Sequence, residues 1–122
     1  MKTNAVLVKE RIITIEENKR IARTYYDHNP DDVELILTPD FTGRTNEMTW
    51  NRDDHKRTWI TYQSQLTDTI HAQVTEGDWV ATWFTRTGLV DNKPWKYEMM
   101  NFMRFVDGKI AEIRELAIDQ AP

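Results

Sequence analysis

The segment WKYEMMNFMRFVDGKIAEIRELAI, residues 95–118, contains two runs of largely alternating side chains separated by Asp107-Gly108. An Asp-Gly pair between two such runs is one of the strongest short-range signals for a β-hairpin. The segment therefore predicts two long antiparallel strands, over residues 95–106 and 109–118, joined by a two-residue turn.

A two-residue turn also predicts the register of this hairpin. Phe105 is then opposite Ile110, and counting outward puts Asn101 directly opposite Arg114 on the more apolar face. Their Cβ atoms are expected roughly 5 Å apart. A buried amide and a buried guanidinium both need hydrogen-bond partners. We therefore expect these two side chains either to pair with each other or to contact a ligand.

The N-terminal half of the chain carries helix signals. Thr14 begins a capping box with the Glu three residues further on, an arrangement that satisfies free N–H groups of a first helical turn. Asn29 before a proline predicts the start of a second, short helix. A third helix is expected to begin after Thr49 or Asn51 and to end near Ser64.

Strand patterns follow the helical ones. Residues 69–76 and 79–87 alternate like strands, and residues 88–94 are expected to form a connection to the C-terminal hairpin. This order predicts a single α+β domain over residues 1–122, with three helices packed on a curved antiparallel sheet. Residues 1–13 form an N-terminal extension that fits either a strand or a helix.

Charge balance and the absence of cysteine exclude several classes of protein. The chain has 16 Lys and Arg against 20 Asp and Glu, for a net charge of −4, whereas nucleic-acid-binding domains usually carry a basic patch. Without cysteine there are no disulfides, thiolate zinc sites or thiolate nucleophiles. Charged residues precede any long apolar run, and no apolar run is long enough to span a bilayer. We therefore expect a cytoplasmic protein that binds neither nucleic acid nor membrane.

Motifs for metal, phosphate or serine chemistry do not occur in the sequence. His28, His55 and His71 lack the spacing of metal ligands, Ser64 lies outside any nucleophile motif, and the glycines are isolated rather than grouped around a phosphate. We therefore expect no metal and no cofactor. His55 is expected on a helix surface, and Asp68 is expected to face water at a strand end.

Several short segments have the order and spacing of one known family. They are EENKRIARTYY at residues 16–26, PDF at 39–41, EGD at 76–78, Gly88, and FMRFVDGKI at 102–110 followed by Glu112. Together they resemble the SnoaL-like branch of the nuclear transport factor 2-like superfamily, over roughly residues 14–119. The resemblance implies a cone-shaped fold in which a bent sheet wraps around helices and encloses an apolar pocket. It also implies a dimer joined through the outer face of the sheet.

The resemblance implies a range of activities, because the family includes polyketide cyclases, ketosteroid isomerases, epoxide hydrolases, dehydratases and non-enzymatic binders. Asn101 matches the second oxyanion-hole donor of the isomerases, Thr45 replaces their catalytic Asp, and Arg114 stands where the cyclases have a Trp. Asp119 lies one position from the terminal acid of the cyclases and matches it if the last strand contains a bulge. The catalytic residues expected from this resemblance are Asp119, Asn101 and Arg114.

The expected pocket is lined by aromatic and long side chains from helices and strands. The side chains expected to contact a ligand are Tyr25, Arg44, Trp59, Tyr62, Tyr97 and Met99. An apolar pocket with a few convergent polar groups is the usual form of a small-molecule site. Arg114 beside Asn101 suits a carbonyl or anionic ligand. An enzyme also needs a base: Asp119 or Glu115 can serve if a bulge turns one of them inward, and Glu112 can serve if burial raises its pKa.

Two functions follow from these observations. The first is a small-molecule-binding protein that works as a cofactor-independent acid–base enzyme, an isomerase, cyclase or hydrolase of a small apolar carbonyl or carboxylate compound. The second is a non-catalytic ligand-binding or assembly domain of the same fold. In both cases Met100 and Phe102, on the second face of the hairpin, predict a homodimer joined through the sheet.

Overall fold

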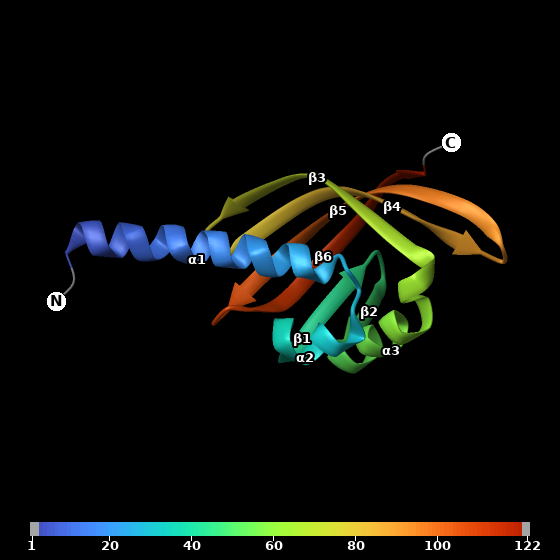
Figure 1. Ribbon diagram of the computed structural model, residues 1–122, viewed down its shortest axis with the longest axis horizontal. Coiled ribbons are helices and arrows are strands. Elements are labelled where there is room, and N and C mark those ends of the chain that lie inside the picture. The colour runs from blue at the N-terminus through green and yellow to red at the C-terminus, as the bar shows by residue number, and fades with distance from the viewer. Residues whose placement is uncertain (1–2, 121–122) are drawn as a thin grey trace.

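The computed structural model describes the backbone of residues 3–120, and their side chains except those of Val8, residues 10–13, Val90, Asp119 and Gln120. A curved six-stranded sheet bends over helices that lie on its concave side (Figure 1). The helices are α1 (Asn4–Tyr25), α2 (Val33–Ile36) and α3 (Arg52–Tyr62), with single 3₁₀ turns at Pro30–Asp32 and Gln63–Gln65. The strands are β1 (Leu37–Thr45), β2 (Met48–Asn51), β3 (Leu66–Glu76), β4 (Trp79–Val90), β5 (Lys93–Val106) and β6 (Lys109–Gln120). The predicted α+β fold with a curved sheet is confirmed. The predicted order, with all helices before the strands, is wrong, because β1 and β2 form between α2 and α3, where the sequence pattern shows a polar stretch.

The sheet has the strand order β2-β1-β6-β5-β4-β3. β1 runs parallel to β6, and the other neighbouring strands are antiparallel. The short β1–β2 hairpin therefore extends the sheet beyond the last strand of the chain, next to α3. The N-terminal half of α1 projects beyond the sheet (Figure 1). No helix among the described residues is both long and apolar enough to cross a membrane.

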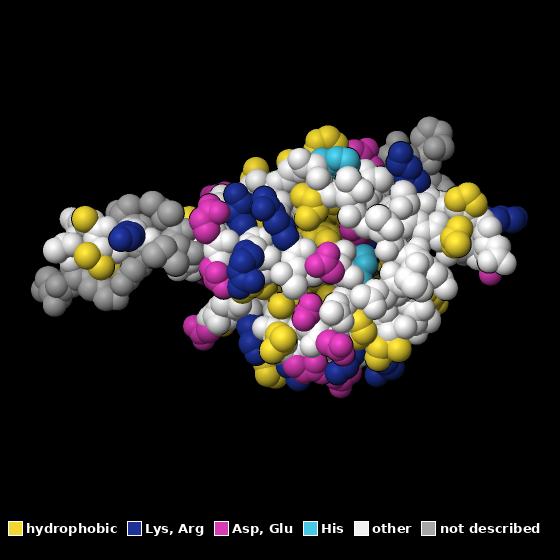
Figure 2. All heavy atoms as spheres, in the orientation of Figure 1, with side chains coloured by type: hydrophobic (Ala, Val, Ile, Leu, Met, Phe, Trp, Pro, Cys, Tyr) yellow, Lys and Arg dark blue, Asp and Glu magenta, His cyan; other side chains and the backbone are white. Residues whose placement is uncertain are grey.

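The first helix begins earlier than the sequence pattern predicts. Thr3 is its N-cap, and the Thr3 hydroxyl accepts a hydrogen bond from the Val6 N–H at 3.3 Å. The described backbone from Asn4 onward is helical, so the N-terminal extension is a helix and not a strand. The predicted capping box at Thr14 is wrong, because Thr14 lies inside this helix. Basic and acidic side chains adjoin each other over the middle of α1 (Figure 2), as in the exposed ion pair of Arg20 with Glu17.

Two predicted helix starts are confirmed. The Asn29 side chain accepts from the Asp31 N–H at 3.1 Å, directly before Pro30. Asn51 caps α3 in a reciprocal capping box with Asp54, with both hydrogen bonds at 2.9 Å. Side-chain oxygens at these positions satisfy N–H groups that the first turn of a helix cannot pair internally.

The connection predicted at residues 88–94 is shorter in the structure. β4 continues to Val90 and β5 begins at Lys93, so the turn consists of Asp91 and Asn92. Both turn residues have a positive φ, 52° and 61°, which is the conformation that tight two-residue hairpin turns require.

The C-terminal hairpin has the predicted turn but not the predicted register. Phe105 pairs with Ile110 as expected, but the next pair is Arg104 with Glu112. Ala111 is therefore an extra residue on β6, which makes this position a β-bulge. Beyond a one-residue bulge, every side chain of the strand points to the face opposite to the predicted one.

The bulge changes which side chains face the helices. Asn101 pairs with Glu115, so the prediction that it lies opposite Arg114 is wrong. Asn101 and Glu115 are both buried on the concave face, whereas Arg114 is exposed on the convex face. The bulge that the sequence allowed for in the last strand therefore exists, and it turns the Glu115 side chain to the concave face.

The hydrophobic core fills the space between the concave face and the helices. Its members include Ile21 and Ala22 of α1, Val33 and Ile36 of α2, and Val80, Phe84, Met103 and Ile113 of the strands. This core packs the helices against the sheet, and a cavity remains at the end where α1 stops and α3 begins.

Candidate active site

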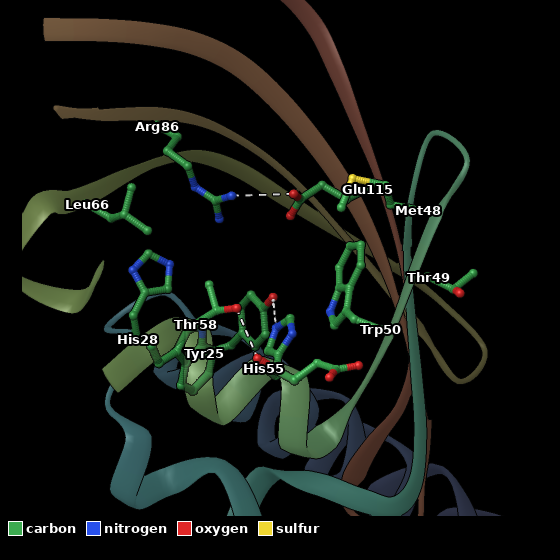
Figure 3. A pocket seen from close by; sticks show the side chains of 12 residues that line it. Tyr25, His28, Met48, Thr49, Trp50, His55, Thr58, Leu66, Arg86 and Glu115 are labelled. Atoms are coloured by element: carbon green, nitrogen blue, oxygen red, sulfur yellow. Dashed lines mark hydrogen bonds and ion pairs between the residues drawn. The ribbon is translucent and has the colours of Figure 1, made fainter. Parts of the chain in front are cut away.

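A cavity of about 490 Å³ opens between the concave face of the sheet and the helices. In the close view of Figure 3, Arg86 and Glu115 project from the strands toward the cavity. Tyr25 and His55 face them from the helices, and Trp50 of β2 stands at one side. The cavity thus has titratable groups on two opposite walls and an aromatic wall between them.

On the helix side, Tyr25 of α1 and His55 of α3 share a hydrogen bond, with 2.5 Å between Tyr25 Oη and His55 Nε2. Burial, together with the nearby Arg86 and His28, lowers the pKa of His55 to about 3. Burial also raises the pKa of Tyr25 well above its ordinary value. Both groups are therefore neutral at physiological pH and can donate hydrogen bonds to a ligand. The expectation that His55 lies on a helix surface is wrong, since it is only 7% exposed.

On the sheet side, Arg86 of β4 connects two carboxylates. Its Nε and Nη2 donate to Asp68 of β3 at 2.9 and 3.0 Å, and its Nη1 donates to Glu115 of β6 at 3.4 Å. Burial alone lowers the pKa of Arg86, but Glu115 and Asp68 more than offset this and raise it above its ordinary value. The guanidinium is therefore permanently charged and holds Glu115 at the cavity wall.

His28 completes this buried cluster. It follows the end of α1 with a positive φ of 51°, and its Nε2 lies 2.8 Å from the Asp68 carboxylate. Burial raises the pKa of Asp68, but hydrogen bonds with His28 and Arg86 lower it below its ordinary value. The Asp68 side chain is fully buried, so the expectation that Asp68 faces water is wrong.

The aromatic wall depends on a glycine. Trp50 stacks on His55 with 5.6 Å between ring centroids and 9° between ring planes. A Cβ on Gly43 of β1 would lie 2.4 Å from the Trp50 indole, so only glycine lets the indole lie against this strand. Trp59 of α3 packs edge-on against Tyr25, with 5.1 Å between ring centroids, and it also lines the cavity.

Among the side chains expected to contact a ligand, Tyr25 and Trp59 line the cavity. Arg44 is exposed on β1, and Tyr62 is 48% exposed at the end of α3. These two therefore lie apart from the cavity wall described above.

The remaining candidates lie elsewhere in the fold. Met99 is buried in the core, with Tyr97 packed against it, and Asn101 is buried with its Oδ1 accepting from the Tyr26 hydroxyl at 2.6 Å. Arg114 donates to Glu112 at 3.0 Å on the convex face. The side chain of Asp119 lies outside the described residues.

Sequence reasoning missed His28, Trp50, Asp68 and Arg86 as site residues, and it placed His55 on a helix surface. Asp68 and Arg86 are cross-strand partners in β3 and β4, and this pairing depends on an irregularity of β3 near His71. Counting back along β3 from the Gly77-Asp78 turn, without that irregularity, puts Asp68 opposite Thr87 instead. A regular strand pattern therefore could not have shown the pair.

No group of three or more His, Cys, Asp or Glu side chains within the described residues could hold a metal ion. The polar groups at the cavity are suited to proton transfer and hydrogen bonding. A held carboxylate on one wall and a neutral hydroxyl–imidazole pair on the other can act on one small molecule between them.

Comparison with solved structures finds the same architecture in proteins of low sequence identity. An LEH-like epoxide hydrolase from M. tuberculosis superposes with a TM-score of 0.73 at 15% identity, covering 84% of this chain and 79% of that one. IdmH of Streptomyces antibioticus, to which a polyketide cyclase activity is ascribed, gives 0.68 at 17% identity, covering 86% and 91%. A protein from Jannaschia sp. CCS1, ascribed to the SnoaL-like polyketide cyclases, gives 0.70 at 14% identity, covering 82% and 84%. These similarities concern the fold.

The sequence itself matches a family model. Residues 19–113 match the model of the SnoaL-like domain, whereas no curated protein sequence matches the chain. The matched range includes the C-terminal part of α1, the β1–β2 hairpin, α3 and the cavity residues described above except Glu115, which lies two residues beyond it. The chain therefore belongs to the SnoaL-like domain family, as the resemblance of its short segments predicted.

Proposed function

We propose that the protein is a cofactor-independent acid–base enzyme that acts on a small, uncharged, apolar carbonyl compound. One observation carries this proposal: Glu115, held by Arg86, faces the neutral Tyr25–His55 pair across a cavity with aromatic walls. A carbonyl oxygen bound to the hydroxyl–imidazole pair would direct its neighbouring carbon toward the carboxylate. The roles below are those that this arrangement supports.

Glu115 is the proposed base. Its carboxylate removes a proton from the carbon next to the carbonyl, so that the C–H bond breaks and its electron pair forms the enol double bond. Tyr25 or His55 donates a hydrogen bond to the oxygen as negative charge develops there. Return of the proton from Glu115 to a different carbon gives an isomer, and attack of the enol on a second carbonyl of the substrate gives a cyclised product.

The charges around Arg86 favour an uncharged substrate over a carboxylate. Its Nε, Nη1 and Nη2 already donate to Asp68 and Glu115. A carboxylate ligand would have to displace one of these partners and would approach the other, which costs desolvation and charge repulsion. Arg114, which was expected to bind an anion, lies on the opposite face of the sheet.

Epoxide hydrolysis is the second candidate reaction. It is supported by the two carboxylates that flank Arg86, because one can activate a water molecule while a neighbouring donor protonates the epoxide oxygen. The similar fold of the M. tuberculosis epoxide hydrolase is in keeping with this candidate. A non-catalytic binding domain is the third reading, and it needs the cavity but not Glu115.

Deuterium exchange tests the proposal directly. The purified protein is incubated in D₂O with a panel of cyclic ketones, and loss of the α-proton signals is followed by NMR. We expect catalysed exchange for at least one ketone, abolished in Glu115→Gln and reduced about 100-fold in Tyr25→Phe. Glu112→Gln is the matched control, because this carboxylate lies on the same strand, pairs with Arg104 and Arg114, and points away from the cavity.

The other outcomes separate the alternatives. Diol formation from uncharged epoxides without ketone exchange would replace the carbonyl proposal by the hydrolase. Thermal stabilisation by the ketones with no turnover in either assay would identify a binding domain. Stabilisation by carboxylates alone would contradict the uncharged substrate.

We also propose that the protein is a homodimer joined through the convex face of the sheet. The apolar side chains exposed there are Val74, Trp83, Phe102, Leu116 and Ile118. A contiguous apolar surface of this kind is unusual on a monomer, and a second copy supplies the same surface in return. The cytoplasmic location expected from the sequence stays a prediction.

A further inference from the structure

Four polar side chains lie side by side across the concave face of the sheet. The Cα pairing joins Gln73 to Thr82, Thr82 to Asn101, and Asn101 to Glu115, one residue from each of β3, β4, β5 and β6. Asn101 and Thr82 are completely buried. A row of polar groups in an apolar interior is costly unless its members are hydrogen-bonded to one another.

The hydrogen bonds of this row have a definite direction. Arg23 Nε donates to Gln73 Oε1 at 2.8 Å, and Gln73 Nε2 donates to Thr82 Oγ1 at 3.1 Å. A guanidinium can only donate, so the Gln73 amide must present its oxygen to Arg23 and its nitrogen to Thr82. Because the Thr82 hydroxyl oxygen accepts from Gln73, its own proton is available for a hydrogen bond to another group.

Tyr26 carries the same direction to Asn101. The Tyr26 phenol is hydrogen-bonded with Thr82, and its hydroxyl donates to Asn101 Oδ1 at 2.6 Å. Burial raises the pKa of Tyr26 above its ordinary value, so this hydroxyl keeps its proton. The Asn101 amide is therefore fixed with its oxygen toward Tyr26 and its nitrogen pointing away from it.

The amide nitrogen at the end of this series is buried without a partner among the described residues. An unpaired buried N–H is strongly unfavourable. Glu115 is the cross-strand neighbour of Asn101 on the same face. The Cβ atoms of such pairs are typically about 5 Å apart. Of the Glu115 carboxylate oxygens, Oε1 is the one that accepts from Arg86.

We infer that Asn101 is a positioning residue for Glu115: its Nδ2–H group donates to the Glu115 carboxylate through one bridging water molecule. This series of hydrogen bonds then begins at the Arg23 cation and ends at the Glu115 anion. Every donor in it points toward Glu115, so the bonds polarise one another. Held by Arg86 from one side and by Asn101 from the other, the carboxylate has a fixed orientation at the cavity wall. The catalytic meaning of this contact rests on the proposed role of Glu115 as a base, whereas the contact itself is tested without any substrate.

The test is the NMR signal of the Asn101 side-chain amide in the ligand-free protein. In wild type, one Nδ2 proton should resonate downfield of ordinary Asn amide protons, and it should move upfield in Glu115→Gln. Glu112→Gln, the same substitution on the opposite face of β6, should leave it in place. Tyr26→Phe removes the donor that orients the amide and should reduce the difference between the two Nδ2 protons.

A second measurement reads the same contact from the carboxylate. With ¹³C-labelled glutamate, Asn101→Leu should shift the carboxyl carbon of Glu115, and Met99→Leu, on the same strand and face, should not. Amide protons of Asn101 that are insensitive to Glu115→Gln, or a Glu115 carbon that is unchanged in Asn101→Leu, would overturn the inference. If instead the contact is found but no ketone exchanges deuterium, the positioning contact stands and the proposed function is rejected.

Discussion

Arg86 donates two hydrogen bonds to Asp68 across the β3–β4 pair, and the Asp68 side chain has no exposed surface. Arg86 lines the cavity, and its bonds with Asp68 hold it so that its third donor reaches Glu115. A buried charge that loses its partner keeps its unfavourable desolvation free energy, and no ion pair offsets it. The pair is therefore more important for keeping Arg86 in place than for net stability.

Asp68→Asn should destabilise the protein by roughly 3–5 kcal/mol, the usual cost of breaking a buried ion pair from one side. Urea unfolding monitored by circular dichroism gives this free energy. The triple variant Asp68→Leu/Arg86→Met/Glu115→Leu, which removes all three buried charges of this group, should lose less than the single variant. Arg20→Met is the control, because its ion pair with Glu17 is exposed, and it should show no measurable loss. An Asp68→Asn protein as stable as wild type would contradict the buried pair.

The stability of the protein should fall as the pH is lowered from about 6.5 toward 3, because of His55. The pKa of His55 is lowered to about 3 in the folded state, against 6.5 for an unperturbed histidine. Between these values the unfolded state binds a proton that the folded state excludes, so each pH unit of acidification costs about 1.4 kcal/mol. Unfolding free energies between pH 7 and pH 4 measure this slope.

His55→Gln should reduce the slope of stability against pH by about 1.4 kcal/mol per pH unit. His71→Gln should leave the slope unchanged, because His71 is exposed on the other face of the sheet. The lowered pKa of Asp68 adds a loss of stability at more acidic pH, below its unfolded value near 3.8. An identical slope for wild type and His55→Gln would show that His55 is accessible to protons in the folded protein.

Gly43→Ala should displace Trp50 from His55, because the added Cβ would lie 2.4 Å from the indole. Overpacking of this kind costs about 1–3 kcal/mol. Chemical unfolding measures the loss, and the near-ultraviolet circular dichroism of the tryptophans reports the displacement.

A smaller side chain at position 50 provides the control for Gly43→Ala. Trp50→Val makes room for the methyl group, so Gly43→Ala should cost little stability in the Trp50→Val background. An equal cost in both backgrounds would mean that Gly43 is required for the backbone of β1 and not for the indole.

Sedimentation equilibrium should give twice the 14.5 kDa chain mass at micromolar concentration. Leu116→Lys, in the middle of the apolar convex face, should shift the mass to that of the monomer. Leu35→Lys is the matched control, since Leu35 is also exposed but belongs to α2. A monomeric wild-type protein would contradict the proposed dimer.

Local signals in the sequence determined the class of the fold and several boundaries of its elements, but not the β1–β2 hairpin between α2 and α3. The turn at Asp107-Gly108 and the caps Asn29 and Asn51 were all predicted where the structure has them. Each of these signals depends on atoms within a few residues of one another. A capping side chain bonds to N–H groups of its own helix, and a turn residue with a positive φ fits its own hairpin. Neither effect depends on the rest of the tertiary structure.

The orientation of the strand side chains was decided only by the tertiary structure. The irregularities at Ala111 of β6 and near His71 of β3 bring Glu115 and Asp68 to the concave face. In a strand of period two, a single extra residue reverses the face of every side chain beyond it. Whether the extra residue is accommodated depends on how the sheet curves around the helices, which no local pattern contains.

The burial of His55 is likewise a tertiary result. On its own helix it precedes Lys56 and Arg57 in a polar sequence, which is typical of a solvent-exposed face. It is covered because the β1–β2 hairpin, added beside β6 at the far end of the sheet, lays Trp50 on its ring. The two walls of the candidate active site thus come from segments that are far apart along the chain, and only the packing of the sheet against the helices brings them together.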